Sequence, residues 1–127
     1  MNKTILVTGL LFGIIAIILG AFGAHGLKKI LGPEELHTFE TGVKYQIYHA
    51  LFLVALSSIT VVGGDIKKIV FYLICVGVVF FSFSIYGLAT NSLTSFDFRK
   101  IGFITPIGGL FLILGWGYLI YGILTKN

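Results

Sequence analysis

Charged residues divide the chain into four long apolar stretches. These stretches contain 24, 20, 28 and 25 residues without any Asp, Glu, Lys or Arg. A helix rises 1.5 Å per residue and needs about 20 residues to cross the hydrocarbon core of a bilayer. Each stretch is long enough, and none shows the two-residue alternation of a β-barrel strand. The stretches are Thr4–Leu27, Tyr45–Gly64, Ile69–Phe96 and Ile101–Thr125.

We therefore predict an all-α, four-helix transmembrane bundle. Backbone groups in lipid are satisfied only by bonds within the segment, which requires helix throughout each span. Short connections favour up-down-up-down order. The whole chain, residues 1–127, is expected to form a single integral membrane domain. The expected spans are residues 4–24, 45–62, 68–89 and 101–124.

The segment before the second span has a different pattern. Leu36, Phe39 and Val43 recur at spacings of three and four, with charged residues between them, which indicates an amphipathic helix. A proline and two glutamates at its start suit the first turn of a helix. We predict that residues 33–44 form an interfacial amphipathic segment leading into the second span, with Gly42 as the bend.

Composition supports a lipid environment. The chain is 57% hydrophobic and 11% charged, whereas soluble domains carry about 25% charged residues. A small soluble domain has too much surface to cover with so few charges. The net charge of +4 comes from lysines and arginines near the expected helix ends, where they would contact headgroups. Hence no nucleic-acid partner is expected, and the balance of charge between the two sides gives no orientation.

Small residues recur seven apart in each expected span. Such a repeat stays on one face when helices wrap left-handedly, and small side chains let the backbones approach closely. We interpret these residues as packing seams within the chain. The alternative is a homo-oligomer built through one seam, since Gly9 and Gly13 also fit a dimerisation motif. The helix-packing candidates are Gly9, Gly13, Gly20, Gly77, Ser84, Gly108 and Gly115.

Polar side chains gather at one end of the predicted bundle. In an antiparallel arrangement, the exits of spans one and three meet the entries of spans two and four. Polar side chains at membrane depth usually face protein or water. We infer a candidate polar vestibule at one membrane face, with helix capping and mutual hydrogen bonding as the alternative. Its residues are His25, Gln46, His49, Tyr86, Asn91 and Thr105.

The sequence offers little catalytic or metal-binding chemistry. Glu34 and His37 resemble one half of a carboxylate-bridged metal motif, but the second half is missing. No span carries a central charge of the kind that proton-coupled exporters need. Arrangements for nucleophilic catalysis and a phosphate-binding glycine loop are also missing from the sequence. We expect a non-enzyme without catalytic residues, metal or cofactor.

Four segments together resemble a known family of small membrane proteins. The segments are GAFGAHGL (residues 20–27), YQIYHAL (45–51), FSFSIY (81–86), and TPIGG (105–109) followed by Gly115-Trp116. The family is called domain of unknown function 423, or uncharacterised protein family 0382, with transmembrane protein 256 as its eukaryotic relative. Its third segment usually reads Phe-Ser-Gly-Ser. Here Phe83 replaces that glycine, which argues against a close backbone approach at this position. The resemblance implies a multi-pass protein of the bacterial inner (plasma) membrane and brings no established activity.

These patterns favour a non-enzymatic partner or assembly protein of the inner membrane. The lipid bilayer is its expected environment, and a second copy or another membrane protein is its candidate partner. The alternative is a small channel or carrier that uses the polar vestibule. A third hypothesis is lipid-headgroup binding by residues 33–44 together with Lys28 and Lys29.

Overall fold

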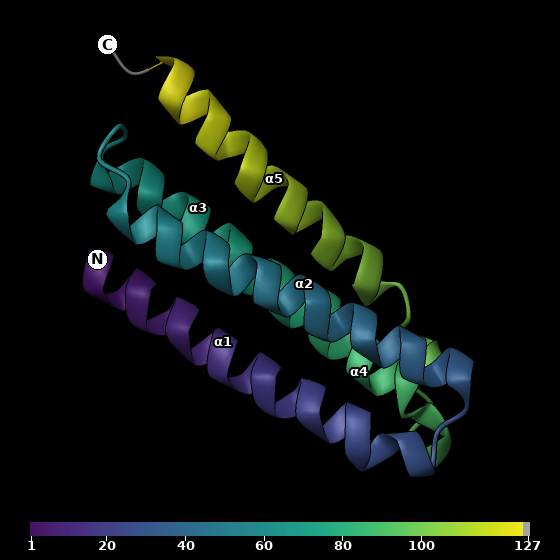
Figure 1. Cartoon of the computed structure of the whole chain (residues 1–127). Coiled ribbons are helices and arrows are strands. Elements are labelled where there is room, and N and C mark those ends of the chain that lie inside the picture. The colour runs from purple at the N-terminus through teal and green to yellow at the C-terminus, as the bar shows by residue number, and fades with distance from the viewer. Residues whose placement is uncertain (126–127) are drawn as a thin grey trace.

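A computed structural model describes residues 1–125 of the chain, which form four long helical rods without strands in that range (Figure 1). A 3₁₀ turn (η1, Leu27–Lys29) follows the first rod, and two more (η3, Asn91–Leu93; η4, Phe98–Ile101) lie in the loop before the last rod. The third rod is α3, a π-helical turn (η2) and α4 in succession. The rods are α1 (Asn2–His25), α2 (Pro33–Ser58), α3 (Gly64–Val78) with η2 (Val79–Phe83) and α4 (Ser84–Ala89), and α5 (Ile104–Thr125).

Consecutive rods run in opposite directions and pack as two pairs (Figure 1). The first pair is α1 with α2, and the second is α5 with α3 and η2. The pairs are joined because α2 also packs along α3, η2 and α4. As a result α2 lies inside the assembly, while α1 and α5 lie on its outer sides.

Three helical segments of the described chain are long and apolar enough to cross a membrane. They are Asn2–Lys29, Gly64–Ala89 and Ile104–Thr125. The remaining rod, α2, is as long as the others but less apolar. Its first turns carry charged residues, and Gln46 and His49 follow at mid-length.

The expected interfacial segment and second span form one continuous helix. Gly32 is extended and its N–H donates to the Glu35 carboxylate (3.3 Å), which caps the start of α2. The helix then runs through Gly42 to Ser58 without interruption. Residues 59–62, which we expected in the second span, lie beyond its end. Helix propensity and packing against α1 together favour continuing the helix over breaking it.

At Gly42 the helix makes a close contact in place of the expected bend. The Tyr86 ring lies so near the Gly42 Cα that an added Cβ would come within 2.6 Å of it. The Gly42 carbonyl also accepts a hydrogen bond from the Ser82 hydroxyl (2.8 Å). Gly42 therefore lets α4 approach α2.

The most deeply buried apolar side chains lie where α1, α2 and α3 meet. Ile5, Leu53, Leu56, Val70 and Ile74 belong to one cluster and are fully buried. By contrast, many large aliphatic side chains on the outer faces of α1 and α5 are exposed. Such large apolar faces suit contact with acyl chains and not with water.

A buried lysine joins three rods at one end of the fold. The Lys67 side chain is only 4% exposed, and its ammonium donates to the Asn2 side-chain oxygen (2.9 Å) and the Ser57 carbonyl (3.3 Å). Ser57 lies in the last turn of α2, where carbonyls lack helical partners and a positive charge is favourable. Lys67 was expected to contact headgroups, and the structure buries it because it caps α2.

Three glycines set the contact between α5 and the third rod. An added Cβ at Gly77 would lie 2.6 Å from Leu112, and one at Gly115 would lie 2.6 Å from Ile74. Gly108 is closer still, because a Cβ there would collide with the backbone of η2. Only a residue without a side chain lets α5 lie this near the π-helical turn. The close backbone approach is thus made by Gly108. Phe83, which stands where the family usually has glycine, is exposed.

The small residues of α1 face α2. A Cβ added at Gly9 would lie 2.9 Å from the Ala50 carbonyl, whereas Gly13 and Gly20 have looser contacts, at 3.9 Å from Ala50 and 3.5 Å from Val43. The Gly9–Gly13 motif therefore packs against a helix of its own chain, and a homo-oligomer built through one seam stays a prediction. Whether these glycines determine stability stays a prediction.

We predict that Gly108→Ala destabilises the fold while Gly117→Ala does not. The methyl group that Gly108→Ala adds meets rigid backbone, and overpacking of this kind costs about 1–3 kcal/mol. At Gly117 nothing lies within 4 Å of an added Cβ. Thermal unfolding in detergent measures both variants. Equal melting temperatures for the two would contradict the contact described at Gly108.

Candidate functional site

Gln46 and Tyr86 meet inside the fold. The Gln46 side chain is fully buried, and its amide donates to the Phe12 carbonyl of α1 (2.9 Å). The Tyr86 hydroxyl donates to the Gln46 side-chain oxygen (2.6 Å). This pair links α1, α2 and α4 and satisfies both buried groups, as polar side chains in a low-dielectric interior require.

Thr105 meets Ser84, at the junction of α4 and α5. Their hydroxyls are 2.6 Å apart, and the Ser84 hydroxyl also lies 2.5 Å from the Phe80 carbonyl. The carbonyls of a π-helical turn lose the regular helical pattern, so a hydroxyl one turn later can bond them. Ser84, a helix-packing candidate, thus bonds both its own rod and α5.

The other two end-of-rod candidates lie apart from these pairs. Asn91 belongs to the loop before α5, where its side-chain oxygen accepts the Phe98 N–H (2.7 Å). Hydrogen bonds from Arg99 to the Asp97 carboxylate, together with the nearby guanidinium charge, lower the pKa of Asp97 in this exposed loop. His25 is exposed at the last residue of α1. The structure thus divides the six residues among separate places, and a vestibule shared by all six stays a prediction.

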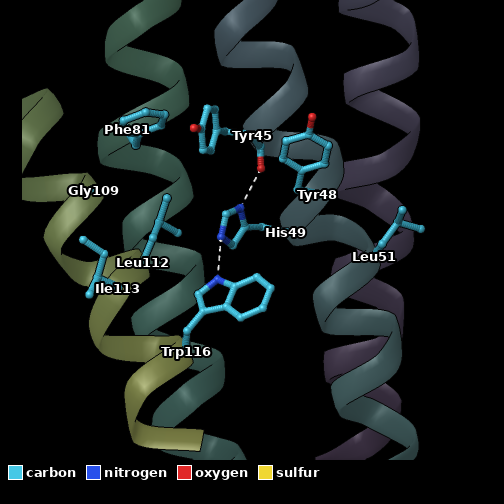
Figure 2. A pocket seen from close by; sticks show the side chains of 9 residues that line it. All are labelled: Tyr45, Tyr48, His49, Leu51, Phe81, Gly109, Leu112, Ile113 and Trp116. Carbon is cyan, nitrogen blue, oxygen red and sulfur yellow. Dashed lines mark hydrogen bonds between the residues drawn. The ribbon is translucent and has the colours of Figure 1, made fainter. Parts of the chain in front are cut away.

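A cavity opens between α2 and α5, and we call it the α2–α5 groove (Figure 2). It has a volume of about 720 Å³ and opens to the side of the bundle. Five of its nine lining residues carry an aromatic ring, His49 included, and none is charged. Of the six vestibule candidates, only His49 takes part. The lining residues are Tyr45, Tyr48, His49, Leu51, Phe81, Gly109, Leu112, Ile113 and Trp116.

The groove lies near the middle of the rods. His49 precedes Ala50, which packs beside Gly13, a residue near the midpoint of α1 (Asn2–His25). Trp116 is likewise close to the midpoint of α5 (Ile104–Thr125). Polar side chains at such a depth would sit far from both membrane faces. In membrane proteins, polar groups in this position are usually functional.

A hydrogen bond between His49 and Trp116 closes one end of the groove, as Figure 2 shows. The His49 Nδ1 lies 2.7 Å from the Tyr45 carbonyl, so it carries the proton and donates. The Nε2 therefore has the free lone pair, which accepts the Trp116 indole N–H (3.0 Å). Because an indole can only donate and a carbonyl can only accept, these partners select the neutral Nδ1–H tautomer.

Aromatic contacts also hold the indole in place. The Trp116 and Phe52 ring centroids are 4.6 Å apart. Elsewhere in the lining, the rings of Tyr45 and Phe81 pack edge to face with their centroids 5.0 Å apart. The indole is thus fixed by one hydrogen bond and one ring contact. A wall held this way is preorganised, which reduces the entropy cost of binding.

Sequence reasoning identified His49 but missed its partners. Tyr45, His49 and Phe52 follow one another at spacings of four and three, which puts them on one face of a helix. That spacing, together with the only tryptophan, is the signal that could have pointed to the groove. The glycines of α5 indicate the face that meets the third rod, but no pattern tells which of its other faces meets α2, because these are all apolar. Within residues 1–125, no group of three or more His, Cys, Asp or Glu side chains could hold a metal ion.

We predict that His49→Phe loosens the groove. The ring is retained, but the N–H of the half-exposed Trp116 indole loses its acceptor, and an unpaired donor facing hydrocarbon is unfavourable. We expect a lower melting temperature and a shift of tryptophan emission to shorter wavelength. His25→Phe, at an exposed position, is the control and should leave both signals in place. Unchanged emission from the His49 variant would rule out this hydrogen bond.

Comparison with known proteins places the chain among uncharacterised membrane proteins. The profile of a family described as protein of unknown function (DUF423) matches residues 19–109. The UPF0382 membrane protein of Staphylococcus saprophyticus is 40% identical, over 94% of this chain and 96% of the relative. The UPF0382 inner membrane protein YgdD of Escherichia coli is 34% identical, over 95% of this chain and 89% of the relative. No solved structure is significantly similar.

Proposed function

The chain belongs to the DUF423 family of membrane proteins, as its motifs predicted, and from this premise we propose that it works by binding other membrane components. We place it in the bacterial inner (plasma) membrane, because the E. coli relative is named an inner membrane protein. In this role it is a non-enzymatic partner or assembly protein.

We propose that all four rods cross the bilayer. The proposal is supported by the contacts between α1 and α2, which continue from Gly9–Leu53 to Gly23–Phe39. Because the two helices pack side by side over this length, both pass through the same depths. The polar side chains at mid-length in α2 are bonded within the chain. With its 26 residues, α2 is about 39 Å long, more than a bilayer core of roughly 30 Å. The excess length would place only its first charged turns at the interface.

The observation that carries the binding role is the α2–α5 groove. It is large, it opens sideways at mid-depth, and its walls offer aromatic surface without a charged or nucleophilic group arranged for catalysis. Ligand sites in proteins are typically apolar cavities of about 300–1,000 Å³ with few polar groups. A lateral opening admits components from within the bilayer and not from water.

A photocrosslinking experiment tests this role. A benzophenone amino acid is placed at Ile113, which lines the groove, or at Ile17 on the outer face of α1; both native side chains are 68% exposed. After irradiation in native membranes, we expect discrete adducts at position 113 in mass spectrometry. At position 17 we expect only the mixture of bulk lipids. The same adduct distribution at both positions would remove the basis for a specific binding site.

A channel or carrier is the second candidate, suggested by the polar pairs Gln46–Tyr86 and Ser84–Thr105 within the rods. These groups are bonded to protein, and no buried side-chain polar atom of the described residues lacks a partner. Paired groups stabilise helix contacts and do not offer a path for ions.

We expect vesicles containing the protein to pass ions and small solutes no faster than protein-free vesicles. Dye-based flux assays measure both. A flux that appears with the protein and disappears on His49→Ala would establish the carrier instead.

A further inference from the structure

The α2–α5 groove is short and walled by large side chains. Its lining residues cover positions 45–51 of α2 and 109–116 of α5, about 10 Å of each helix at 1.5 Å per residue. A partner transmembrane helix packs along a longer seam and favours small residues, which let backbones meet. Here Gly109 is the only small residue among the lining side chains. The dimensions therefore suit a compact ligand and not a helix.

Two tyrosines whose hydroxyls have no hydrogen-bond partner among the described residues belong to the lining of the groove. Tyr45 and Tyr48 both line it, and neither hydroxyl has a hydrogen-bond partner among residues 1–125. A hydroxyl without a partner is unfavourable in hydrocarbon, so these groups favour a ligand that accepts hydrogen bonds. His49 and Trp116 already use their bonding capacity on each other and on the Tyr45 carbonyl. Among the lining residues of the groove, the two tyrosine hydroxyls are thus the polar side-chain groups without a hydrogen-bond partner.

The aromatic walls of the groove and its lack of charged residues restrict the class of ligand further. Phe81 and the Trp116 indole are flat surfaces that accept another ring in stacked or edge-to-face contact. No lining residue is charged, so an ionised ligand would meet no counter-charge in a low-dielectric site. Leu51 and Ile113 are exposed at the rim and would border a hydrocarbon tail leaving the groove sideways.

We propose that the α2–α5 groove binds a neutral lipid whose flat ring carries carbonyl groups, the chemistry of a quinone with a hydrocarbon tail. The ring lies against Trp116 and Phe81, and its carbonyl oxygens accept hydrogen bonds from Tyr45 and Tyr48. The tail remains among the acyl chains. This inference rests on the proposed binding role of the groove and adds the class of ligand.

Trp116 is the only tryptophan of the chain, so its fluorescence reports directly on the groove. The probe is a decyl-substituted 1,4-benzoquinone titrated into the protein in lipid vesicles, where no other protein contributes emission, because quinones quench indole fluorescence on contact. We expect saturable quenching. Each hydrogen bond is worth about 0.5–1.5 kcal/mol, so Tyr48→Phe should raise the apparent Kd about 2- to 10-fold, and Tyr45→Phe likewise.

Tyr72→Phe is the matched control, because Tyr72 and Tyr48 are both 53% exposed but Tyr72 lies outside the groove. It should leave the Kd unchanged. Emission measured without the probe verifies that each variant keeps the Trp116 environment. Quenching that rises linearly without saturation, or equally in all variants, overturns the inference.

A second comparison separates this inference from the proposed function. Decylbenzene has the same tail without carbonyls and should not displace the quinone; equal displacement would overturn carbonyl recognition. Discrete adducts at position 113 that consist of a peptide or an ordinary phospholipid would also overturn it, while leaving specific binding in the groove intact. Identical adducts at positions 113 and 17 would instead remove the proposed function itself.

Discussion

Hydrocarbon offers no hydrogen bonds, so a polar side chain within it must find its partner in the protein. With α2 in the bilayer, as we propose, this constraint explains how α2 is placed. Its Gln46 bonds to α1 and α4, and its His49 bonds to α5. The least apolar rod is therefore one of the two inner rods, with neighbours that satisfy it. The outer rods have little polarity to satisfy, and their exposed faces are aliphatic.

Where two helices need to approach closely, the chain uses glycine and a local change of helix type. A π-helical turn adds a residue to the helix and redirects the side chains around it. In η2, Ser82 bonds to the carbonyl of Gly42, while Phe81 lines the α2–α5 groove. Gly108 lets α5 pack directly on that turn. The turn thus shapes both the contact between the rods and one wall of the groove.

The rods could be predicted because charge interrupts the sequence at their ends, and the small residues identified several contact faces. Gly9, Gly77, Gly108 and Gly115 all lie at close helix contacts. What could not be predicted was which polar groups would meet. In a soluble helix, the apolar face indicates the core, whereas here the faces toward lipid and toward protein are equally apolar. The position of Trp116 against His49 depends on which side of α5 faces α2, and the pattern leaves this open.

The α2–α5 groove also depends on an asymmetry between the pairs of rods. Because α1 packs on α2 and α5 packs on α3 and η2, no helix of the described chain covers the space beside His49 and Trp116. The two ring systems are held from behind by Phe52 and by the Tyr45 carbonyl. The groove is therefore rigid at its base and open at its side.

The Lys67 bond has a consequence for how the protein is made. Its partner Asn2 is 65 residues earlier in the chain, so the first residues emerge from the ribosome long before the ammonium that fixes them. During that interval the α1–α2 hairpin is held by its own contacts, including Gly9 against Ala50. The N-terminus is secured only after the start of the third rod has been synthesised, so this bond forms later than the first contacts of the α1–α2 hairpin.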